Sequence, residues 1–206
     1  MAGLLAASVV LVGACTKDSE PAARELTGYT RQPVPSVAGV SLPRADGKGE
    51  WAVTAPKGGL RVVFFGYTSC PDVCPTTMSD LKRGLLTLAK GDRSRVEVGM
   101  ATIDPTRDTP EKLTDYVTTF IPDAVGLRTT DAAALSKAAA PFGATYSVKP
   151  GKGGVPEVAH SGDLYAVDDQ GHVVLQWPFG TAAKDLGADL AQLLDRTETA
   201  APTGGS

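Results

Sequence analysis

The feature that most constrains this chain is a pair of cysteines between a predicted buried strand and a predicted helix. Residues 60–65 form a short apolar run of β-branched and aromatic side chains bounded by glycines, which is typical of a strand buried on both faces. Cys70 and Cys74 follow, and Pro75 suits the first turn of a helix while Gly91 suits its end. The apolar residues in between recur at helical spacing: Met78, Leu81, Leu85 and Leu88. We therefore expect both thiols at a helix N-terminus, whose partial positive charge favours the thiolate form.

Strand and helix patterns alternate along the rest of the chain, with Thr109 and Asp131 as the expected helix N-caps. The predicted elements are strands at 96–103 and 125–129, helices at 109–120 and 131–140, a hairpin of 164–167 with 173–177, and a closing helix at 181–196. Three charged residues before the first cap are expected to serve capping and loop ion pairing rather than partner docking: Asp104, Arg107 and Asp108. This order predicts an α/β protein with a central mixed β-sheet flanked by helices and a C-terminal β-hairpin and helix. A cysteine pair after a core strand favours the thioredoxin-like version of that class.

The composition sets the size and the broad class of the protein. With 206 residues, 42% of them hydrophobic, the chain has enough apolar material for one buried core, and we expect one monomeric domain over 36–198. The 20 basic and 23 acidic side chains leave a net charge of −3 without a basic cluster, which argues against nucleic-acid binding. Two histidines and three cysteines exclude a zinc site of several imidazoles or of four thiolates. Any metal site must therefore be small and mixed in its ligands.

The first fifteen residues have the pattern of a targeting segment. Residues 1–14 carry no charge and are shorter than the roughly 20 residues of a transmembrane helix, so we interpret them as a signal peptide, with a buried N-terminal helix as the alternative. No Lys or Arg precedes the apolar run, which departs from the usual secretory pattern. Residues 11–15 resemble the cleavage box of bacterial lipoproteins, which implies a lipid on Cys15 and a location on the outer face of the bacterial cytoplasmic membrane. We expect 15–35 to be a flexible tether and 199–206 a disordered tail.

Two thiols four positions apart allow three kinds of chemistry. They can form a structural disulfide, although so small a loop removes little chain entropy. They can exchange disulfides with a partner, although thioredoxin-type motifs have two residues between the cysteines and this chain has three. They can also bind a soft or borderline ion, copper(I) above all and zinc as the other option, with one imidazole as the natural third ligand.

His160 and His172 are the two imidazoles of the chain. His160 lies in a polar, glycine-rich stretch, 151–162, which is predicted as a loop that can carry a ligand to a site built elsewhere. Its local pattern taken alone favours a solvated loop histidine. His172 follows the hairpin turn and is expected to be an exposed strand residue, and Met78 and Met100 are expected to pack in the core rather than bind copper.

Three blocks of the sequence resemble the SCO/SenC family, whose members are copper-binding, thioredoxin-fold proteins involved in cytochrome c oxidase assembly. Residues 64–76 (FFGYTSCPDVCPT) resemble its cysteine motif, 102–110 (TIDPTRDTP) its Asp-Pro-x-Arg-Asp-Thr-Pro segment, and 158–168 (VAHSGDLYAVD) its histidine loop and following strand. The resemblance covers about 36–198 and implies one copper ion per monomer, Cu(I) or Cu(II), with three ligands: Cys70, Cys74 and His160. Ala159 stands where many relatives carry Asp, so this chain lacks a carboxylate that could orient the imidazole.

The resemblance implies a metallochaperone, and not an enzyme, that delivers copper to the dinuclear copper centre of cytochrome c oxidase. The implied partners are the copper-bearing subunit of the oxidase and other copper chaperones on the same side of the membrane. The alternative is a thiol–disulfide reductase that keeps the acceptor's cysteines reduced, which needs Cys70 and Cys74 but not His160. A third hypothesis is a peroxiredoxin-like peroxidase, because those enzymes share the fold class.

Overall fold

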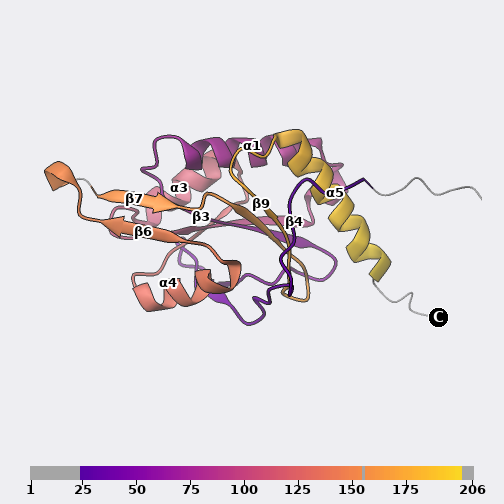
Figure 1. Ribbon diagram of the computed structural model, residues 1–206, viewed down its shortest axis with the longest axis horizontal. Helices are drawn as coiled ribbons and strands as arrows, with labels where there is room; N and C mark the ends of the chain where they lie inside the picture. Colours follow the sequence, from indigo (N-terminus) through magenta and orange to yellow (C-terminus); the bar gives the residue numbers. More distant parts are fainter. Residues whose placement is uncertain (1–23, 155, 201–206) are drawn as a thin grey trace, which may run out of the picture.

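The computed structural model describes residues 24–154 and 156–200, and its centre is a five-stranded sheet (Figure 1). The strand order is β5-β4-β3-β8-β9. The bounds are β3 (Leu60–Gly66), β4 (Val96–Thr102), β5 (Val125–Leu127), β8 (Leu164–Val167) and β9 (Val173–Trp177). Strands β3, β4 and β5 are parallel, whereas β8 pairs antiparallel with both β3 and β9. This is the mixed sheet that the sequence predicts, with the expected hairpin at one edge.

Helices cover both faces of this sheet, with α1, α3 and α5 on one side and α4 on the other (Figure 1). Their bounds are α1 (Val73–Thr87), α2 (Lys90–Arg93), α3 (Pro110–Phe120), α4 (Ala132–Ala139) and α5 (Ala183–Ala200), with short 3-10 turns η1 (Ala140–Phe142) and η2 (Lys152–Gly154). Thr109 caps α3 by accepting the N–H of Lys112 at 3.2 Å, and Asp131 caps α4. The predicted α/β class, with helices flanking a mixed sheet, is therefore confirmed.

The central strand β3 is buried on both faces, as its continuous apolar sequence predicts. Val62, Val63 and Phe64 have no exposed surface, because β4 and β8 flank the strand and helices cover the two faces of the sheet. The chain leaves β3 at Gly66, opposite Thr102 at the carboxyl end of β4. The loop with the two cysteines therefore begins at this edge of the sheet.

The predicted end of the first helix is wrong, because Gly91 lies within α2 rather than after α1. Helix α1 stops at Thr87, where Leu88 becomes extended and its N–H bonds to the Leu85 carbonyl. Leu88 is buried, so the turn brings the last leucine of the apolar stripe into the core. The ends of β4, β5 and α5 differ from the prediction by one to four residues.

Two short ribbons outside the main sheet are not predicted from the sequence. Strand β1 (Ser41–Pro43) pairs with β2 (Glu50–Ala52), and β6 (Tyr146–Lys149) pairs with β7 (Glu157–His160). The second ribbon projects from the domain at the left of Figure 1. His160 is thus the last residue of a strand and not a loop residue, and the loop prediction for 151–162 is wrong over β7. Every side chain of β6 and β7 is half-buried or exposed, so these strands lack the apolar pattern that would reveal them.

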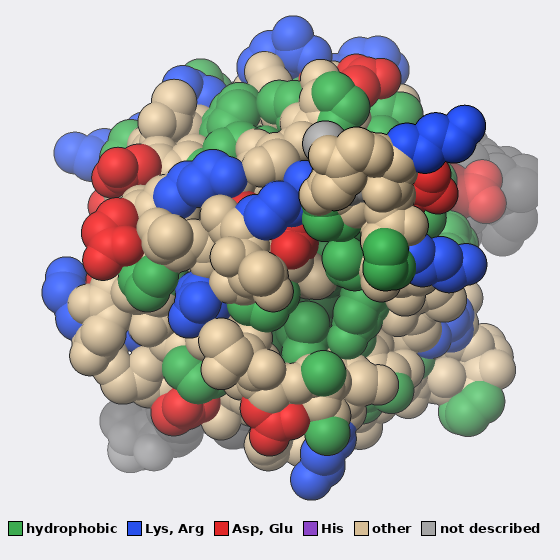
Figure 2. Space-filling view, turned by 90° about the vertical axis from the view of Figure 1, so that its left-hand side faces the viewer, with side chains coloured by type: hydrophobic (Ala, Val, Ile, Leu, Met, Phe, Trp, Pro, Cys, Tyr) green, Lys and Arg blue, Asp and Glu red, His purple; other side chains and the backbone are tan. Residues whose placement is uncertain are grey.

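The end of the molecule from which this ribbon projects is a mixed surface (Figure 2). Hydrophobic side chains gather around a hollow near its centre, and basic and acidic side chains lie around them. A groove of about 300 Å³ lies along β6 and β7, and its lining residues are Thr145, Tyr146, Ser147, Ala159, His160 and Ser161. The imidazole is therefore accessible from the surface.

Within the region 15–35 that the sequence predicts as a flexible tether, the described part, from Arg24 onward, lies against the domain. Arg24 forms an ion pair with the buried Asp189 of α5, and the Tyr29 N–H bonds to the Gln176 carbonyl at 2.9 Å. The predicted signal peptide and Cys15 lie outside the described residues, as does most of the predicted tail, while α5 extends to Ala200. Across 24–154 and 156–200, no helix combines the length and the apolar character needed to cross a membrane.

Candidate metal centre

The two cysteines lie where β3 ends and α1 begins. Cys74 is the second residue of α1 and is fully buried, whereas Cys70 lies in the preceding loop and is 9% exposed. A Cβ atom at Gly66 would lie 3.0 Å from Cys74 Sγ and 2.6 Å from the Phe64 ring, so a glycine is required for the sulfur to sit here. Pro75 lies in the first turn of α1, as predicted.

Three potential ligand atoms converge at this edge of the sheet. Both thiols are free, and the backbone N–H of Cys74 donates to Cys70 Sγ at 3.3 Å. His160 Nε2 lies 3.5 Å from Cys74 Sγ. The two sulfurs and an imidazole nitrogen all lie within 4.8 Å of one another. The fold therefore brings together the three side chains that the family resemblance singles out.

Aromatic rings and one backbone group hold the imidazole of His160. The rings of Phe64 and Tyr67 lie edge-on to it, each with its centroid 5.9 Å from that of the imidazole. The N–H of Gly162 donates to Nδ1 at 3.2 Å, while Nε2 faces the sulfurs. These neighbours fix the orientation of the ring in the metal-free protein, although the Gly162 N–H donates to Nδ1, where a carboxylate would accept from it.

The two thiols have different pKa values because their surroundings differ. Burial works against ionisation of Cys70, but hydrogen bonds from the backbone N–H groups of Cys74 and Asp72 outweigh it and lower the pKa of Cys70. Burial raises the pKa of Cys74 far above its ordinary value, and the neighbouring Cys70 adds to the rise. Burial also lowers the pKa of His160, which favours the neutral imidazole that a metal requires. Cys70 is therefore the first of the two thiols to ionise.

Two tyrosines near the site are not predicted from the sequence. Tyr67 is 7% exposed, burial and the nearby Cys70 raise its pKa to about 12, and the guanidinium of Arg107 lies 5.6 Å above its ring. The buried hydroxyl of Tyr116 in α3 has no hydrogen-bond partner among the residues described, and burial and the charge of Cys74 raise its pKa. Tyr116 lies in an amphipathic helix, where an aromatic residue has the pattern of ordinary core packing.

Other residues considered from the sequence occupy the expected environments. Met78 and Met100 are fully buried, which confirms their assignment to the core. His172 directly precedes β9, and its side chain is 47% exposed, as predicted, with Nδ1 lying 3.5 Å from Asp168. His172 therefore takes no part in the site.

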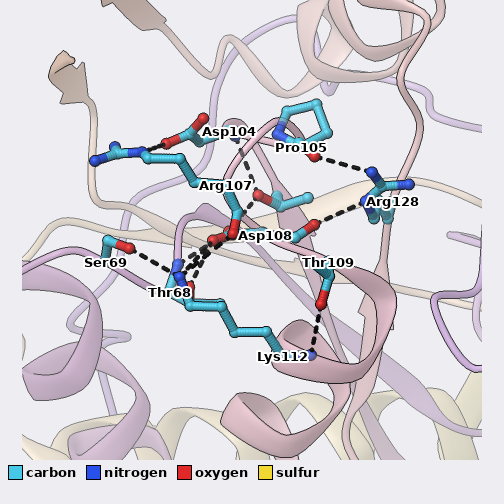
Figure 3. Close-up of polar contacts among 10 residues, drawn as sticks. Thr68, Ser69, Asp104, Pro105, Arg107, Asp108, Thr109, Lys112 and Arg128 are labelled. Atoms are coloured by element: carbon cyan, nitrogen blue, oxygen red, sulfur yellow. Dashed lines mark hydrogen bonds and ion pairs between the residues drawn. The ribbon is translucent and has the colours of Figure 1, made fainter. Parts of the chain in front are cut away.

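A charged network lies beside the cysteine loop (Figure 3). Asp104 and Arg107 form an ion pair in the loop after β4, which confirms the predicted loop pairing. Helix α3 is capped by Thr109, the cap expected from the sequence, rather than by one of these charged residues. Asp108 is fully buried and accepts hydrogen bonds from Thr68, two residues before Cys70.

Comparisons with known proteins agree with this arrangement. The model of the SCO1/SenC family matches residues 45–195. A Stutzerimonas stutzeri protein described as a candidate copper-binding protein is 34% identical over 115 residues, which is 56% of each chain. The apo Sco1 protein of Thermus thermophilus is 31% identical with a TM-score of 0.73, covering 84% of this chain and 99% of that one. Bradyrhizobium japonicum ScoI, solved with copper bound, is 29% identical with a TM-score of 0.64, covering 74% and 96%.

The matched region includes both cysteines, His160 and the charged loop. This chain spans about half the length of the Stutzerimonas relative, whereas it covers nearly all of the solved Sco domains. These neighbours confirm the thioredoxin-like fold expected from the sequence. The chain belongs to the SCO1/SenC family.

Proposed function

We propose that this protein binds one copper ion through Cys70, Cys74 and His160 and delivers it to a partner protein. The observation that carries the proposal is the convergence of their ligand atoms within 4.8 Å. Two thiolates and one imidazole form a soft donor set that suits copper, whereas magnesium and calcium prefer oxygen ligands. The copper-bound ScoI from Bradyrhizobium japonicum supports the same choice of metal.

Each ligand has a distinct task in this proposal. Cys70, with its lowered pKa, supplies the first thiolate, and Cys74 loses its proton as the second sulfur–copper bond forms. His160 completes the set through Nε2, the nitrogen that faces Cys74. Because the N–H of Gly162 donates to Nδ1 in the metal-free protein, the ring proton must move from Nε2 to Nδ1, and that hydrogen bond must break, as copper binds. Two thiol protons leave for each ion bound, so copper affinity falls as the pH falls. A partner's ligands can approach past Cys70 and His160 and replace the three ligands in turn, which a closed structural site resists.

The destination that we assign is the dinuclear copper centre of cytochrome c oxidase, with the copper-bearing subunit of that enzyme as the partner. This part of the proposal is supported by family membership and the resemblance of the motifs. A lipid on Cys15 would anchor the protein to the outer face of the cytoplasmic membrane. From Cys15 to Arg24, where the described structure begins, the chain can span at most roughly 32 Å, so the domain would stay close to the bilayer.

A thiol–disulfide reductase remains the second candidate function, and the difference between the two thiols favours it. A thiolate at Cys70, which is 9% exposed, beside a fully buried thiol at Cys74 suits attack on a partner's disulfide followed by release. In that reaction Cys70 first forms a mixed disulfide, and Cys74 then displaces the partner. Two electrons and two protons pass to the partner, which leaves as a dithiol, and Cys70 and Cys74 remain as a disulfide.

Titration of the reduced protein with copper(II), followed by thiolate-to-copper charge-transfer absorption, tests the proposed site. The absorption band should be lost or markedly altered in Cys70→Ala, Cys74→Ala and His160→Ala. His172→Ala is the matched control, because it removes the exposed histidine outside the site, and its spectrum should equal that of the unaltered protein. An unchanged band in His160→Ala would remove that residue from the ligand set.

The two candidate functions separate in cells that depend on this protein for oxidase assembly. If copper delivery is the function, His160→Ala should abolish assembly of the copper centre along with copper binding. If reduction of the acceptor is the function, the same variant should lose copper and still support assembly. Both functions require Cys70 and Cys74, so only the histidine variant distinguishes them.

A further inference from the structure

We propose that the buried carboxylate of Asp108 is a positioning group for Cys70 and acts through Thr68. The inference rests on the proposed metal site, because it concerns how the loop that carries Cys70 is held beside Cys74 and His160. The hydrogen bonds of the Asp108 carboxylate go to Thr68 and Thr102 and to none of the three ligands, so its hold on Cys70 passes through the loop, whereas its charge also acts directly on Cys74.

Asp108 holds the start of the cysteine loop with both of its carboxylate oxygens (Figure 3). The backbone N–H of Thr68 donates to Oδ2 at 3.0 Å, and the Thr68 hydroxyl donates to Oδ1 at 2.5 Å. Two hydrogen bonds from one residue to one carboxylate fix the orientation of Thr68 as well as its distance. Thr68 is two residues from Cys70, so a shift of this contact must change the path of the chain to the sulfur.

The carboxylate is itself held by the body of the domain. The hydroxyl of Thr102, the last residue of β4, donates to Asp108 Oδ2 at 2.6 Å. Arg128 donates to the backbone carbonyl of Asp108 at 2.8 Å and to that of Pro105 at 2.9 Å. Lys112 of α3 lies 3.7 Å from Oδ1 and also donates to the Ser69 hydroxyl at 3.0 Å. Asp108 therefore connects the cysteine loop to β4, to α3 and to the segment after β5.

A fully buried carboxylate at this position calls for an explanation beyond the fold alone. Desolvation of a charged group is costly, and the nearby cap of α3 is already provided by Thr109. Residues 67–72 belong to neither β3 nor α1, so regular secondary structure does not determine where Cys70 lies. Metal sites tolerate errors of only about half an ångström in ligand position, which makes a fixed loop valuable here.

The test compares two threonines that donate hydroxyl groups to the same carboxylate. Thr68→Val removes the hydroxyl donor on the cysteine loop and leaves the backbone N–H in place. Thr102→Val removes the hydroxyl donor on β4, and Thr68→Ser keeps a hydroxyl at the loop position. Thr102 also accepts the N–H of Asp104 at 3.1 Å, so its replacement is at least as disruptive to local packing. Asp108→Asn removes the charge of the carboxylate. If that variant does not fold, the comparison of Thr68→Val with Thr102→Val still tests whether Asp108 positions Cys70.

Two measurements on each reduced protein separate positioning from general stability. Copper affinity should fall at least tenfold in Thr68→Val. In Thr68→Ser and in the control Thr102→Val it should stay within about threefold of that of the unaltered protein. Amide hydrogen exchange at residues 68–74 in the metal-free protein should accelerate at least tenfold in Thr68→Val alone. The exchange experiment needs no copper, so it tests the loop even if the unaltered protein binds no metal and the proposed function fails. Unchanged exchange and affinity in Thr68→Val, or equal effects in Thr68→Val and Thr102→Val, would overturn the inference.

Discussion

At the scale of single residues, the two sulfurs differ in both exposure and acid strength. Cys70 is 9% exposed and has a lowered pKa, whereas Cys74 has no exposed surface and has a raised pKa. We therefore expect an alkylating reagent at neutral pH to modify Cys70 at least tenfold faster than Cys74, because the thiolate is the reactive form. Peptide mapping by mass spectrometry after brief treatment with iodoacetamide measures both rates. Equal rates, or faster modification of Cys74, would contradict the assigned environments.

The burial of His160 leads to a second prediction, which concerns how the free energy of unfolding depends on pH. The pKa of His160 is lowered in the folded protein, so below the ordinary histidine value of about 6.5 the unfolded chain binds a proton that the folded chain does not. The free energy of unfolding should therefore fall as the pH drops through this range. The slope from one proton cannot exceed about 1.4 kcal/mol per pH unit, and a partly exposed ring should give less than this limit.

Urea denaturation at several pH values between 5 and 7 measures this effect in the reduced, metal-free protein. His160→Gln should flatten the acid side of the stability profile relative to the unaltered protein. His172→Gln is the control, because it removes the chain's other histidine at an exposed position. A profile for His160→Gln that runs parallel to the original would show that His160 does not contribute.

The residues of the site could be predicted only in part from local pattern. The cysteines stand out through their place between a buried strand and a helix. His160 does not, because its contact with Cys74 joins positions 86 residues apart and its own surroundings read as a polar loop. The family resemblance supplied that residue. The Thr68–Asp108 contact is equally non-local, since it depends on β3 and β4 ending at the same edge of the sheet.

At the scale of elements, α1 and α5 cross unusually closely at a pair of glycines. A Cβ atom at Gly187 would lie 2.1 Å from Thr87 Oγ1 and 2.6 Å from the Gly84 carbonyl oxygen. We expect Gly187→Ala to lower the free energy of unfolding by about 2 kcal/mol, because the overpacking outweighs the gain of about 1 kcal/mol in helix propensity. Chemical denaturation measures the change. Gly91→Ala is the control, since a Cβ there meets open space, and it should leave stability unchanged or slightly higher.

Elements were predictable where the apolar pattern is strong and long. Strand β3 and helices α1 and α3 have continuous or periodic apolar sequence, and the structure contains them within a few residues of the prediction. The β6–β7 ribbon has two four-residue strands in which no side chain is fully buried, so neither period nor propensity distinguishes it from a loop. The end of α1 was predicted wrongly at Gly91. The helix ends at Thr87, where the chain turns so that Leu88 is buried, and no glycine is involved.

At the scale of the whole molecule, Asp189 joins the N-terminal segment to the core. Its side chain is fully buried and accepts hydrogen bonds from the Trp177 indole at 2.8 Å and from the Thr27 and Gly28 N–H groups at 3.1 Å, besides the ion pair with Arg24. Such an aspartate in an amphipathic helix has the pattern of a solvent-facing residue, which explains why the sequence predicts a tether here. The contact holds the first described residues of the chain against the domain.

Removing this carboxylate should release the N-terminal segment without altering the metal site. Asp189→Ala leaves the Trp177, Thr27 and Gly28 donors without their acceptor, and we expect it to lower the free energy of unfolding by about 3 kcal/mol. Limited digestion with trypsin should then cleave after Arg24 and Arg31 at least tenfold faster, because both arginines lie in the N-terminal segment that Asp189 holds against the domain. Asp195→Ala, an exposed position on the same helix, is the control and should leave both stability and digestion unchanged. If the segment stays docked, digestion will be as slow in Asp189→Ala as in the control, and Asp189 will have no part in holding it.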